Sequence, residues 1–322
     1  MSRTPVTRVG LQLADYAFDG IPDTKLFDRL AEIALAAEGA GFDSLWTMDH
    51  LHQIATVGDR EQPILEAYTT LAALAAVTKS ARLGTLVTAC GFRSPALLAK
   101  MVTTIDIISG GRTILGIGAG WHEEEYRSYG MKFPGAGERL AQLSEAVQIC
   151  RAMFTEQAPA FSGAHHSIHE PLNVPEPIQP DGPPILIGGG GERTLIPMVA
   201  RYGDACNFFG APATVRRKID LLERACAEIS RDPSEITKTW LGGAIMEKTE
   251  WDLQSATERL GRRLGLPPRA ARGFALCGTR DDFLNQAAEY RAVGVDGIIV
   301  YTLDPDDVDY TRRIGEALSA TA

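Results

Sequence analysis

The strongest constraint on the fold is a regular alternation of short apolar segments with helical segments along the whole chain. Short, nearly continuous apolar runs are typical of strands that are buried on both faces of a parallel sheet. The eight predicted strands are 8–13, 42–48, 82–88, 113–120, 184–187, 204–210, 237–245 and 297–303. The eight predicted helices are 26–40, 64–79, 95–109, 137–154, 192–202, 213–230, 280–293 and 308–320.

This alternation predicts a single (β/α)8 barrel domain over residues 1–322, because each strand is followed by a helix and no linker divides the chain. A doubly wound open sheet with a smaller second domain is the alternative, but the composition break that two domains would require is missing. Two segments interrupt the alternation, after the fourth and the seventh strand. Residues 157–183 predict an irregular surface excursion, and residues 247–275 predict a charged helical insertion.

The composition restricts the class of protein and of partner. The chain has 322 residues, 45% of them hydrophobic, and a formal net charge of −9, which argues against a nucleic-acid partner. An anionic ligand must therefore be bound by local donors. We find no signal-peptide pattern, no apolar run of about eighteen residues and no CxxC pair among the cysteines. We expect a cytoplasmic protein with a small-molecule substrate and no membrane partner.

In a (β/α)8 barrel, the functional side chains lie at the C-terminal ends of the strands. This rule brings the chemically distinctive residues to one mouth: Gln12, Asp49, His50, 87–90, 119–123, 188–191 and Tyr301. The fourth strand is the most informative, because Gly116, Gly118 and Gly120 alternate along its end and Trp121 and His122 follow. Such glycines let another group approach the backbone, whereas a solvated acidic turn after a plain strand is the alternative. A dinucleotide fingerprint is rejected, since that motif follows the first strand of its unit.

Four consecutive glycines, residues 188–191, follow the fifth strand. Free backbone N–H groups at the start of a helix bind anions. We therefore predict a phosphate site at Gly189, Gly190 and Gly191, with Arg193 and the Thr194 hydroxyl as further donors. A flexible strand-to-helix turn is the alternative, although such a turn needs one glycine rather than four.

The pair Asp49-His50 is the best catalytic candidate in the sequence. A histidine at a strand end can move a proton near neutral pH, and the adjacent aspartate can hold a cofactor ring. A capping aspartate beside a surface histidine is the alternative. No metal site is predicted, because His50 and His52 have no third ligand at a recognisable spacing. The 157–183 segment contains three histidines, which we expect on the loop surface: His165, His166 and His169.

Three motifs together resemble the luciferase-like monooxygenase superfamily, and more narrowly its branch that uses coenzyme F420, an 8-hydroxy-5-deazaflavin. They are the GIGAGWHEEEYR segment at 116–127, SPALLAK at 94–100 with ISGGR at 108–112, and PILIGGGGE at 184–192. The resemblance covers almost the whole chain. It implies a (β/α)8 barrel, a homodimer, and a flavin or deazaflavin ring at the strand C-termini.

Site residues follow from the same resemblance, position by position. It implies that Asp49 contacts the ring and that His50 lies beside the reactive carbon. It implies a cis peptide at or near Leu86–Val87 in the third strand. The remaining implied cofactor contacts are Val87, Thr88 or Ala89 in the third strand, Ala119, Gly120 and Trp121 after the fourth, and the phosphate residues Gly189–Gly191 with Arg193 and Thr194.

The sequence also departs from the family pattern. Where F420-dependent sugar-phosphate and alcohol dehydrogenases place a catalytic glutamate, this chain has Trp121, and the nearest acids are Glu123 and Glu124. Ile54 replaces a tryptophan of those enzymes. The expected function is F420-dependent hydride transfer to or from a small organic substrate. An FMN-dependent monooxygenase and a non-catalytic flavin-binding protein are the alternatives.

Overall fold

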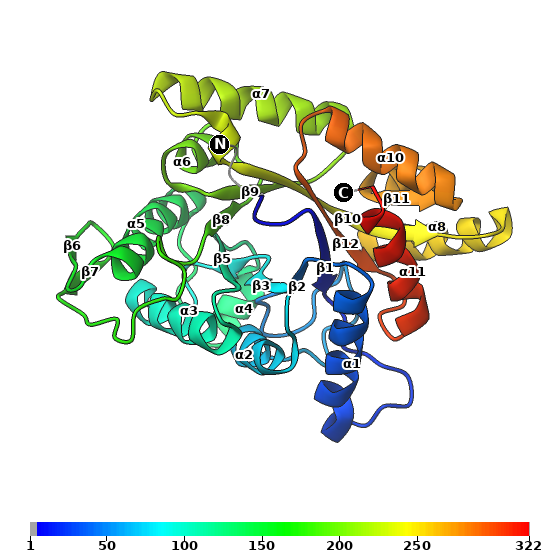
Figure 1. The fold of residues 1–322 in the computed structure, drawn as a ribbon, viewed down its shortest axis with the longest axis horizontal. Helices are drawn as coiled ribbons and strands as arrows, with labels where there is room; N and C mark the ends of the chain where they lie inside the picture. Colours follow the sequence, from blue (N-terminus) through cyan, green and yellow to red (C-terminus); the bar gives the residue numbers. More distant parts are fainter. Residues whose placement is uncertain (1–4, 322) are drawn as a thin grey trace.

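The computed structural model describes residues 5–321, and within them eight parallel strands close into a barrel (Figure 1). The barrel strands are β1 (Val9–Leu13), β2 (Ser44–Thr47), β3 (Arg82–Thr85), β5 (Thr113–Gly118), β8 (Ile185–Gly188), β9 (Ala205–Phe208), β10 (Thr237–Met246) and β12 (Gly297–Thr302). The ring closes because β1 pairs in parallel with β2 and β12, and β10 pairs with β9 and β12. The predicted (β/α)8 barrel is confirmed, and the open sheet is excluded.

The outer layer consists of helices that alternate with these strands, as predicted. They are α1 (Leu26–Gly39), α2 (Ala67–Val77), α3 (Pro95–Ser109), α5 (Ala136–Thr155), α6 (Leu195–Tyr202), α7 (Pro212–Glu228), α10 (Arg280–Ala292) and α11 (Val308–Ser319). Local chemistry sets their ends: α3 starts at a proline and stops at Gly110, which adopts a left-handed conformation with φ +70°. Within residues 5–321, no helix has both the length and the apolar character to cross a membrane.

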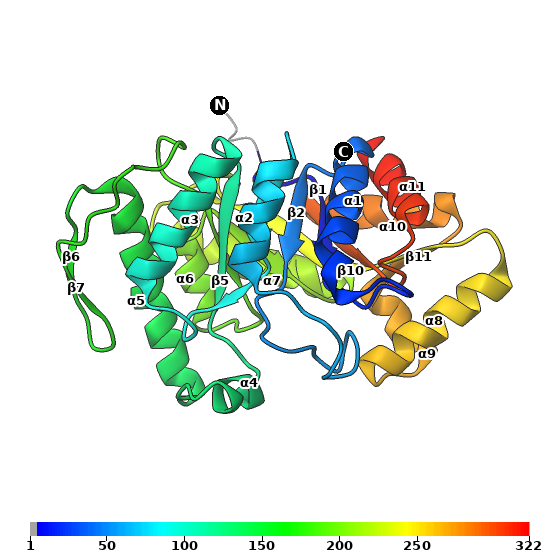
Figure 2. The same ribbon diagram turned by 90° about the horizontal axis from the view of Figure 1, so that it is seen from below.

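Both predicted insertions are present, on opposite sides of the barrel (Figure 2). The 157–183 segment is not wholly irregular, since β6 (Ala160–Ser162) and β7 (Ser167–His169) form an antiparallel hairpin. The Glu145 carboxylate of α5 accepts hydrogen bonds from three backbone N–H groups of the hairpin turn, so a side chain outside the segment fixes it. The 247–275 segment holds α8 (Glu250–Leu264), α9 (Pro268–Ala271) and a 3-10 helix (Arg272–Phe274), and then β11 (Ala275–Gly278) adds a further strand to β10.

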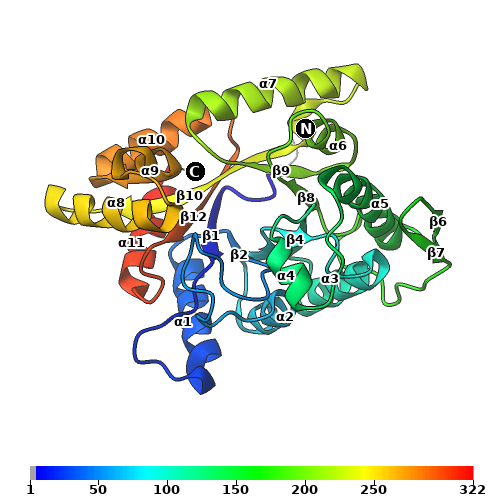
Figure 3. The ribbon, with the colours of Figure 1, turned by 180° about the vertical axis from the view of Figure 1, so that it is seen from behind.

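Two features at the barrel mouth differ from the prediction. A short helix, α4 (Glu123–Ser128), follows β5 and lies over the mouth (Figure 3). Helix α6 begins at Leu195 rather than at residue 192, so a turn separates the four glycines from the helix. The free N–H groups of the glycine segment therefore belong to a loop and not to the first turn of a helix.

The third strand is interrupted at its C-terminal end. The Leu86–Val87 peptide is cis, as the resemblance implied, and pairing with β5 resumes at β4 (Thr88–Ala89). The glycines of neighbouring strands make room for this irregular segment. A Cβ on Gly116 would lie 1.7 Å from the Thr85 carbonyl oxygen, and one on Gly188 would lie 2.8 Å from a Val87 methyl group. The third strand of the same chain therefore occupies part of the space that these glycines leave free.

The Glu38 carboxylate at the end of α1 connects this helix to the turn before β3. It accepts hydrogen bonds from the N–H groups of Lys79, Ser80 and Ala81 at 2.9, 2.6 and 2.7 Å. Burial alone would raise the pKa of Glu38, but these donors hold it below its ordinary value of 4.5. The carboxylate therefore stabilises the fold above about pH 4.5, and this contribution is lost as the pH falls through the lower pKa of the folded state.

We expect Glu38→Gln to lower the free energy of unfolding by about 1 kcal/mol at pH 7, since solvent weakens these charge-assisted hydrogen bonds. The difference from wild type should shrink as the pH is lowered to about 3, because the wild-type carboxylate is then protonated. Urea unfolding at both pH values measures this. The control is Glu61→Gln in an exposed loop. A difference that stays constant with pH would contradict the assignment.

Candidate active site

A cavity of about 450 Å³ opens at the C-terminal ends of the strands. Ten of the predicted site residues line it: Asp49, His50, Val87, Ala89, Ala119, Gly120, Trp121, Gly189, Gly190 and Gly191. These residues come from the ends of four neighbouring barrel strands, β2, β3, β5 and β8. The rule that strand ends gather at one mouth therefore brought most of the predicted site together correctly.

Three predicted residues are placed elsewhere. Thr88 is fully buried behind the wall, where its hydroxyl lies 2.6 Å from the Tyr68 hydroxyl and donates to Thr85 Oγ1 at 3.0 Å. Of the alternatives Thr88 and Ala89, Ala89 is the residue that lines the cavity. Arg193 and Thr194 are in the turn before α6 and are not part of the cavity wall.

His50 is held by a buried glutamate. Its Nδ1 donates to Glu125 Oε2 at 2.8 Å, and the Leu51 N–H donates to Glu125 Oε1 at 2.7 Å. Burial alone would raise the pKa of Glu125, but the hydrogen bond and charge of His50 and the backbone donor bring it below its ordinary value. An ionised Glu125 fixes the proton of His50 on Nδ1 and leaves Nε2 as the acceptor atom of the neutral ring.

Glu125 is the acid at this site, and the two glutamates named from the sequence are not. Glu123 and Glu124 are exposed and pair with Arg127 and Arg60. Glu125 is 1% exposed because it lies on the inward face of α4. The sequence left open whether Glu123 or Glu124 takes the place of the missing glutamate, and in the structure Glu125 is the glutamate of α4 that lines the cavity. Glu125 and the adjacent Tyr126 are the two buried residues of α4, and no sequence signal distinguishes Glu125 from its two neighbouring glutamates.

Asp49 forms a buried ion pair with an arginine of the loop that follows β4. Arg93 donates to both Asp49 oxygens, at 2.5 and 3.0 Å, and also to Glu66 Oε1 at 2.5 Å. The Asp49 side chain is 0% exposed and the Arg93 side chain 13%. Burial raises the pKa of Asp49, and the Arg93 hydrogen bonds and charge offset part of that rise. The main role of the carboxylate in this structure is to fix Arg93 below the cavity.

Aromatic and basic side chains complete the wall on the α4 side. Trp121 is 59% exposed, and its ring lies edge-on to His50 with a centroid separation of 5.7 Å. Burial lowers the pKa of His122, and the nearby Glu125 carboxylate opposes that shift. Arg139 of α5 lies over the Phe133 ring at 4.0 Å and donates to the Gly120 carbonyl oxygen at 3.3 Å. The last contact joins α5 to the glycine end of β5.

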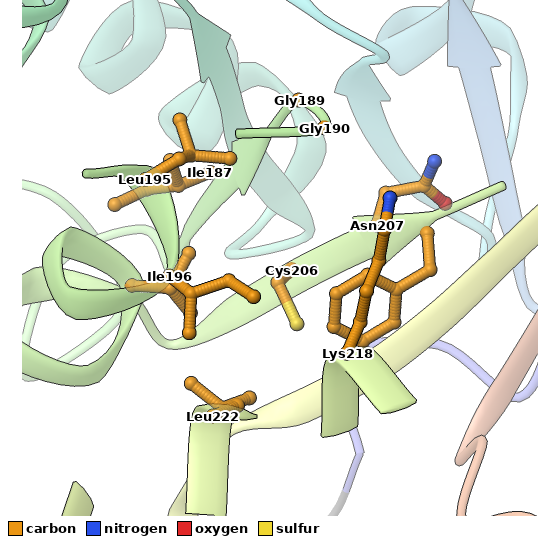
Figure 4. Close-up of a pocket in the computed structure, with 11 residues that line it drawn as sticks. Ile187, Gly189, Gly190, Leu195, Ile196, Cys206, Asn207, Lys218 and Leu222 are labelled. Atoms are coloured by element: carbon orange, nitrogen blue, oxygen red, sulfur yellow. The ribbon is translucent and has the colours of Figure 1, made fainter. Parts of the chain in front are cut away.

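The glycine segment after β8 has a lysine below it. Gly189, Gly190 and Lys218 of α7 line a small hollow together with Asn207 (Figure 4). A Cβ on Gly190 would have one near neighbour, Lys218 Nζ at 3.9 Å. The backbone N–H groups of this segment and the lysine ammonium are donors that suit an anionic group. Sequence spacing could not select Lys218, because it lies in the helix after the next strand.

Comparison with known proteins shows that the chain is similar to one protein family and to several individual proteins. The model of the luciferase-like monooxygenases matches residues 12–266. An F420-dependent glucose-6-phosphate dehydrogenase of Kineococcus radiotolerans is 35% identical over 175 residues, which are 54% of this chain and 49% of that protein. The match thus spans about half the length of this curated relative.

Solved structures with the same fold include enzymes that bind each of the two cofactors considered above. An F420-dependent secondary alcohol dehydrogenase in complex with an F420-acetone adduct has a TM-score of 0.81 at 20% identity, and the match covers 98% of both chains. The oxygenating constituent of 3,6-diketocamphane monooxygenase from Pseudomonas putida, in complex with FMN, has a TM-score of 0.76 at 18% identity and the same coverage. At these identities the likeness shows the fold alone.

Proposed function

Since the chain belongs to the luciferase-like monooxygenase family, we propose that it is a coenzyme F420-dependent oxidoreductase. It would transfer a hydride between the deazaflavin and a small organic substrate, with the deazaflavin carbon supplying or accepting the hydride. The F420-dependent glucose-6-phosphate dehydrogenase named above supports this cofactor. The substrate itself is left open, because Trp121 and Ile54 depart from the pattern of F420-dependent sugar-phosphate and alcohol dehydrogenases.

The observation that carries the proposal is a largely apolar cavity with cations at one edge. Apolar side chains such as Leu86 and Phe92 line its walls, which suits a planar ring. At the glycine edge, Lys218 Nζ lies 3.9 Å from the position of a Cβ on Gly190, and Arg193 is exposed in the turn that follows the glycines. Neither cation makes an ion pair with another described residue. Two such cations beside free backbone N–H groups suit a phosphate group.

A second hollow favours F420 over FMN. It has a volume of about 430 Å³, lies between α5 and α6, and is lined by Thr194 and Arg201 among others. Leu140 lines both this hollow and the main cavity, so the two are adjacent. F420 carries an anionic polyglutamate tail beyond its phosphate, and FMN ends at the phosphate. A hollow with an arginine and the hydroxyl side chains of Ser144 and Thr194 therefore supports the longer cofactor.

In this proposal the chain's own residues bind and orient the two reactants. The glycine segment and its cations hold the phosphate, and the irregular third strand at Val87 supports the ring. His50, fixed by Glu125, exchanges a proton or a hydrogen bond with the substrate through Nε2. Trp121 covers the substrate side of the cavity and excludes water there.

The alternative within the family is an FMN-dependent monooxygenase, which the FMN-bound relative represents. A non-catalytic flavin-binding protein is the second alternative. Both would use the same cavity and the same phosphate edge, so only direct measurement of cofactor preference and turnover separates them from the proposal.

Fluorescence titration of the cofactor-free protein with F420 and with FMN tests the cofactor. We expect F420 to bind at least about tenfold more tightly than FMN. Gly190→Leu should weaken F420 binding by about tenfold or more, because the new side chain enters the phosphate edge while the fold has room for its Cβ. The matched control is Gly39→Leu at the end of α1, where a Cβ meets nothing within 4 Å. Tighter FMN binding would favour the monooxygenase, and binding of neither cofactor would contradict both enzymes.

A further inference from the structure

Two histidines and a glutamate converge at the edge of the active-site cavity, from segments about seventy residues apart in the chain. His52 lies in the loop after β2, and His122 and Glu125 lie at the start of α4. One ligand atom from each of the three lies within 4.8 Å of the other two. His122 Nδ1 is 3.5 Å from Glu125 Oε2, and the rings of His52 and His122 have centroids 5.2 Å apart with their planes at 72°.

The 3.5 Å His122–Glu125 distance and the 5.2 Å ring separation are close to the geometry of a tetrahedral metal site, and the 4.8 Å limit means that His52 must move by up to about 1.5 Å to complete it. With metal–ligand bonds of about 2.0–2.1 Å, two ligand atoms on one tetrahedral ion lie about 3.3 Å apart, and two coordinated imidazole rings have centroids about 5 Å apart. The observed distances require shifts of a few tenths of an ångström for His122 and Glu125. An ordinary side-chain rotation supplies a shift of that size.

One buried ring nitrogen of each histidine has no hydrogen-bond partner among the described residues. These atoms are His52 Nε2 and His122 Nδ1. A buried polar atom normally has a partner, and each exception requires an explanation. Two such atoms beside one buried carboxylate, each able to offer a lone pair, are explained by a cation that binds all three.

The outer contacts of the three residues also suit a metal site. His52 Nδ1 lies 3.2 Å from the Gln53 carbonyl oxygen, and donation to this oxygen leaves the lone pair on Nε2. The Glu125 oxygens accept from Leu51 N–H and His50 Nδ1, which fixes the carboxylate while each oxygen retains a second lone pair. Ligating histidines and carboxylates are commonly oriented by hydrogen bonds of this kind.

We propose that His52, His122 and Glu125 form a binding site for a divalent transition metal ion, with zinc as the best-matched ion. Two imidazole nitrogens and one carboxylate are the ligand set of several zinc sites that keep an open position. The ion would lie between two cavities. His122 and Glu125 line the active-site cavity, and His52 and His122 line a neighbouring cavity of about 480 Å³. The open position of the ion would take an oxygen atom of a ligand in either cavity.

Sequence patterns did not indicate this site, because its ligands are not spaced as a motif. The pair His50 and His52 suggested two ligands without a third. In the structure His50 binds Glu125 instead, and His122 takes its place as the second imidazole. The proposal does not depend on F420, since it uses only the contacts among these side chains.

The test is metal binding by tag-free protein that has been treated with a chelator. We expect calorimetry to find one Zn²⁺ per chain, and Co²⁺ to give the visible absorption of a low-symmetry site. His122→Phe and His52→Gln should each weaken Zn²⁺ binding by about 100-fold. The matched control is the double variant His165→Ala/His169→Ala in the β6–β7 hairpin, which removes exposed histidines and should bind as wild type does.

A second measurement separates loss of the site from loss of the fold. Saturating Zn²⁺ should raise the melting temperature of the wild type and of the hairpin variant but not that of His122→Phe. F420 titration of the metal-free protein, run in parallel, reports on the proposed cofactor separately from the metal. Zn²⁺ binding that survives in both His122→Phe and His52→Gln, that is lost in the hairpin variant, or that is absent in the wild type would overturn the metal site.

Discussion

The Arg93→Ala variant is expected to lower the free energy of unfolding by about 3–5 kcal/mol. Arg93 donates both arms of its guanidinium to Asp49, whose side chain is 0% exposed. Removal of the arginine leaves this carboxylate buried without a counter-charge, and the cost of that unpaired charge exceeds the cost of the lost contact itself. The same guanidinium also lies 4.7 Å from the centre of the Tyr68 ring, so packing is lost as well.

Urea unfolding measures this loss, and Arg127→Ala is the matched control. Arg127 also pairs with a glutamate, Glu123, but its side chain is 77% exposed, so its removal should change the free energy of unfolding by less than about 0.5 kcal/mol. Arg93→Lys keeps the charge but not the two-armed contact, and should lie between the two. Equal stability of Arg93→Ala and Arg127→Ala would show that the buried pair contributes no more than an exposed one.

The barrel was predictable from the sequence because its strands are buried on both faces. Such strands appear as short apolar runs, and eight of them alternating with helices leave few possible architectures. Elements of three to six residues escaped prediction, namely β6, β7, β11 and α4. The three strands form because they pair with a neighbouring strand, and their own composition does not indicate them. The start of α6 was misplaced for a related reason, since four glycines allow several turn geometries before the helix.

The strand ends that line the candidate site were predictable, but the contacts within the site were not. Strand order alone placed His50 and the glycine segment at one mouth. The partners of those residues come from distant parts of the chain: Arg93 is 44 residues from Asp49, and Glu125 is 75 residues from His50. A single sequence carries no record of such pairings. It also presented three adjacent glutamates as equivalent, and only the orientation of α4 separates the buried one from the two exposed ones.

The second large effect is expected from His50→Ala, which should lower kcat by about 10²–10⁴-fold if His50 has the role proposed above. Reduction of a ketone needs a hydride at the carbonyl carbon and a proton at the oxygen. His50 in its imidazolium form, with Nδ1–H donated to Glu125, can give that proton from Nε2 or stabilise the oxygen by a hydrogen bond from Nε2. The assay is oxidation of reduced F420 on the protein by a panel of ketones and conjugated enones, with the substrate that the wild type reduces fastest. F420 affinity should change by less than about threefold, and His169→Ala in the hairpin is the control.

The two roles of His50 can be separated by the His50→Gln variant. The amide nitrogen of the introduced side chain lies near the position of the imidazole Nε2, so the variant can donate a hydrogen bond but cannot give up a proton. If His50 is the proton donor, His50→Gln should be as slow as His50→Ala, since neither variant has a group that titrates near neutral pH. If His50 only stabilises the developing charge on oxygen, His50→Gln should recover most of the activity. Wild-type turnover in His50→Ala would contradict both roles and restrict the histidine to orienting Glu125.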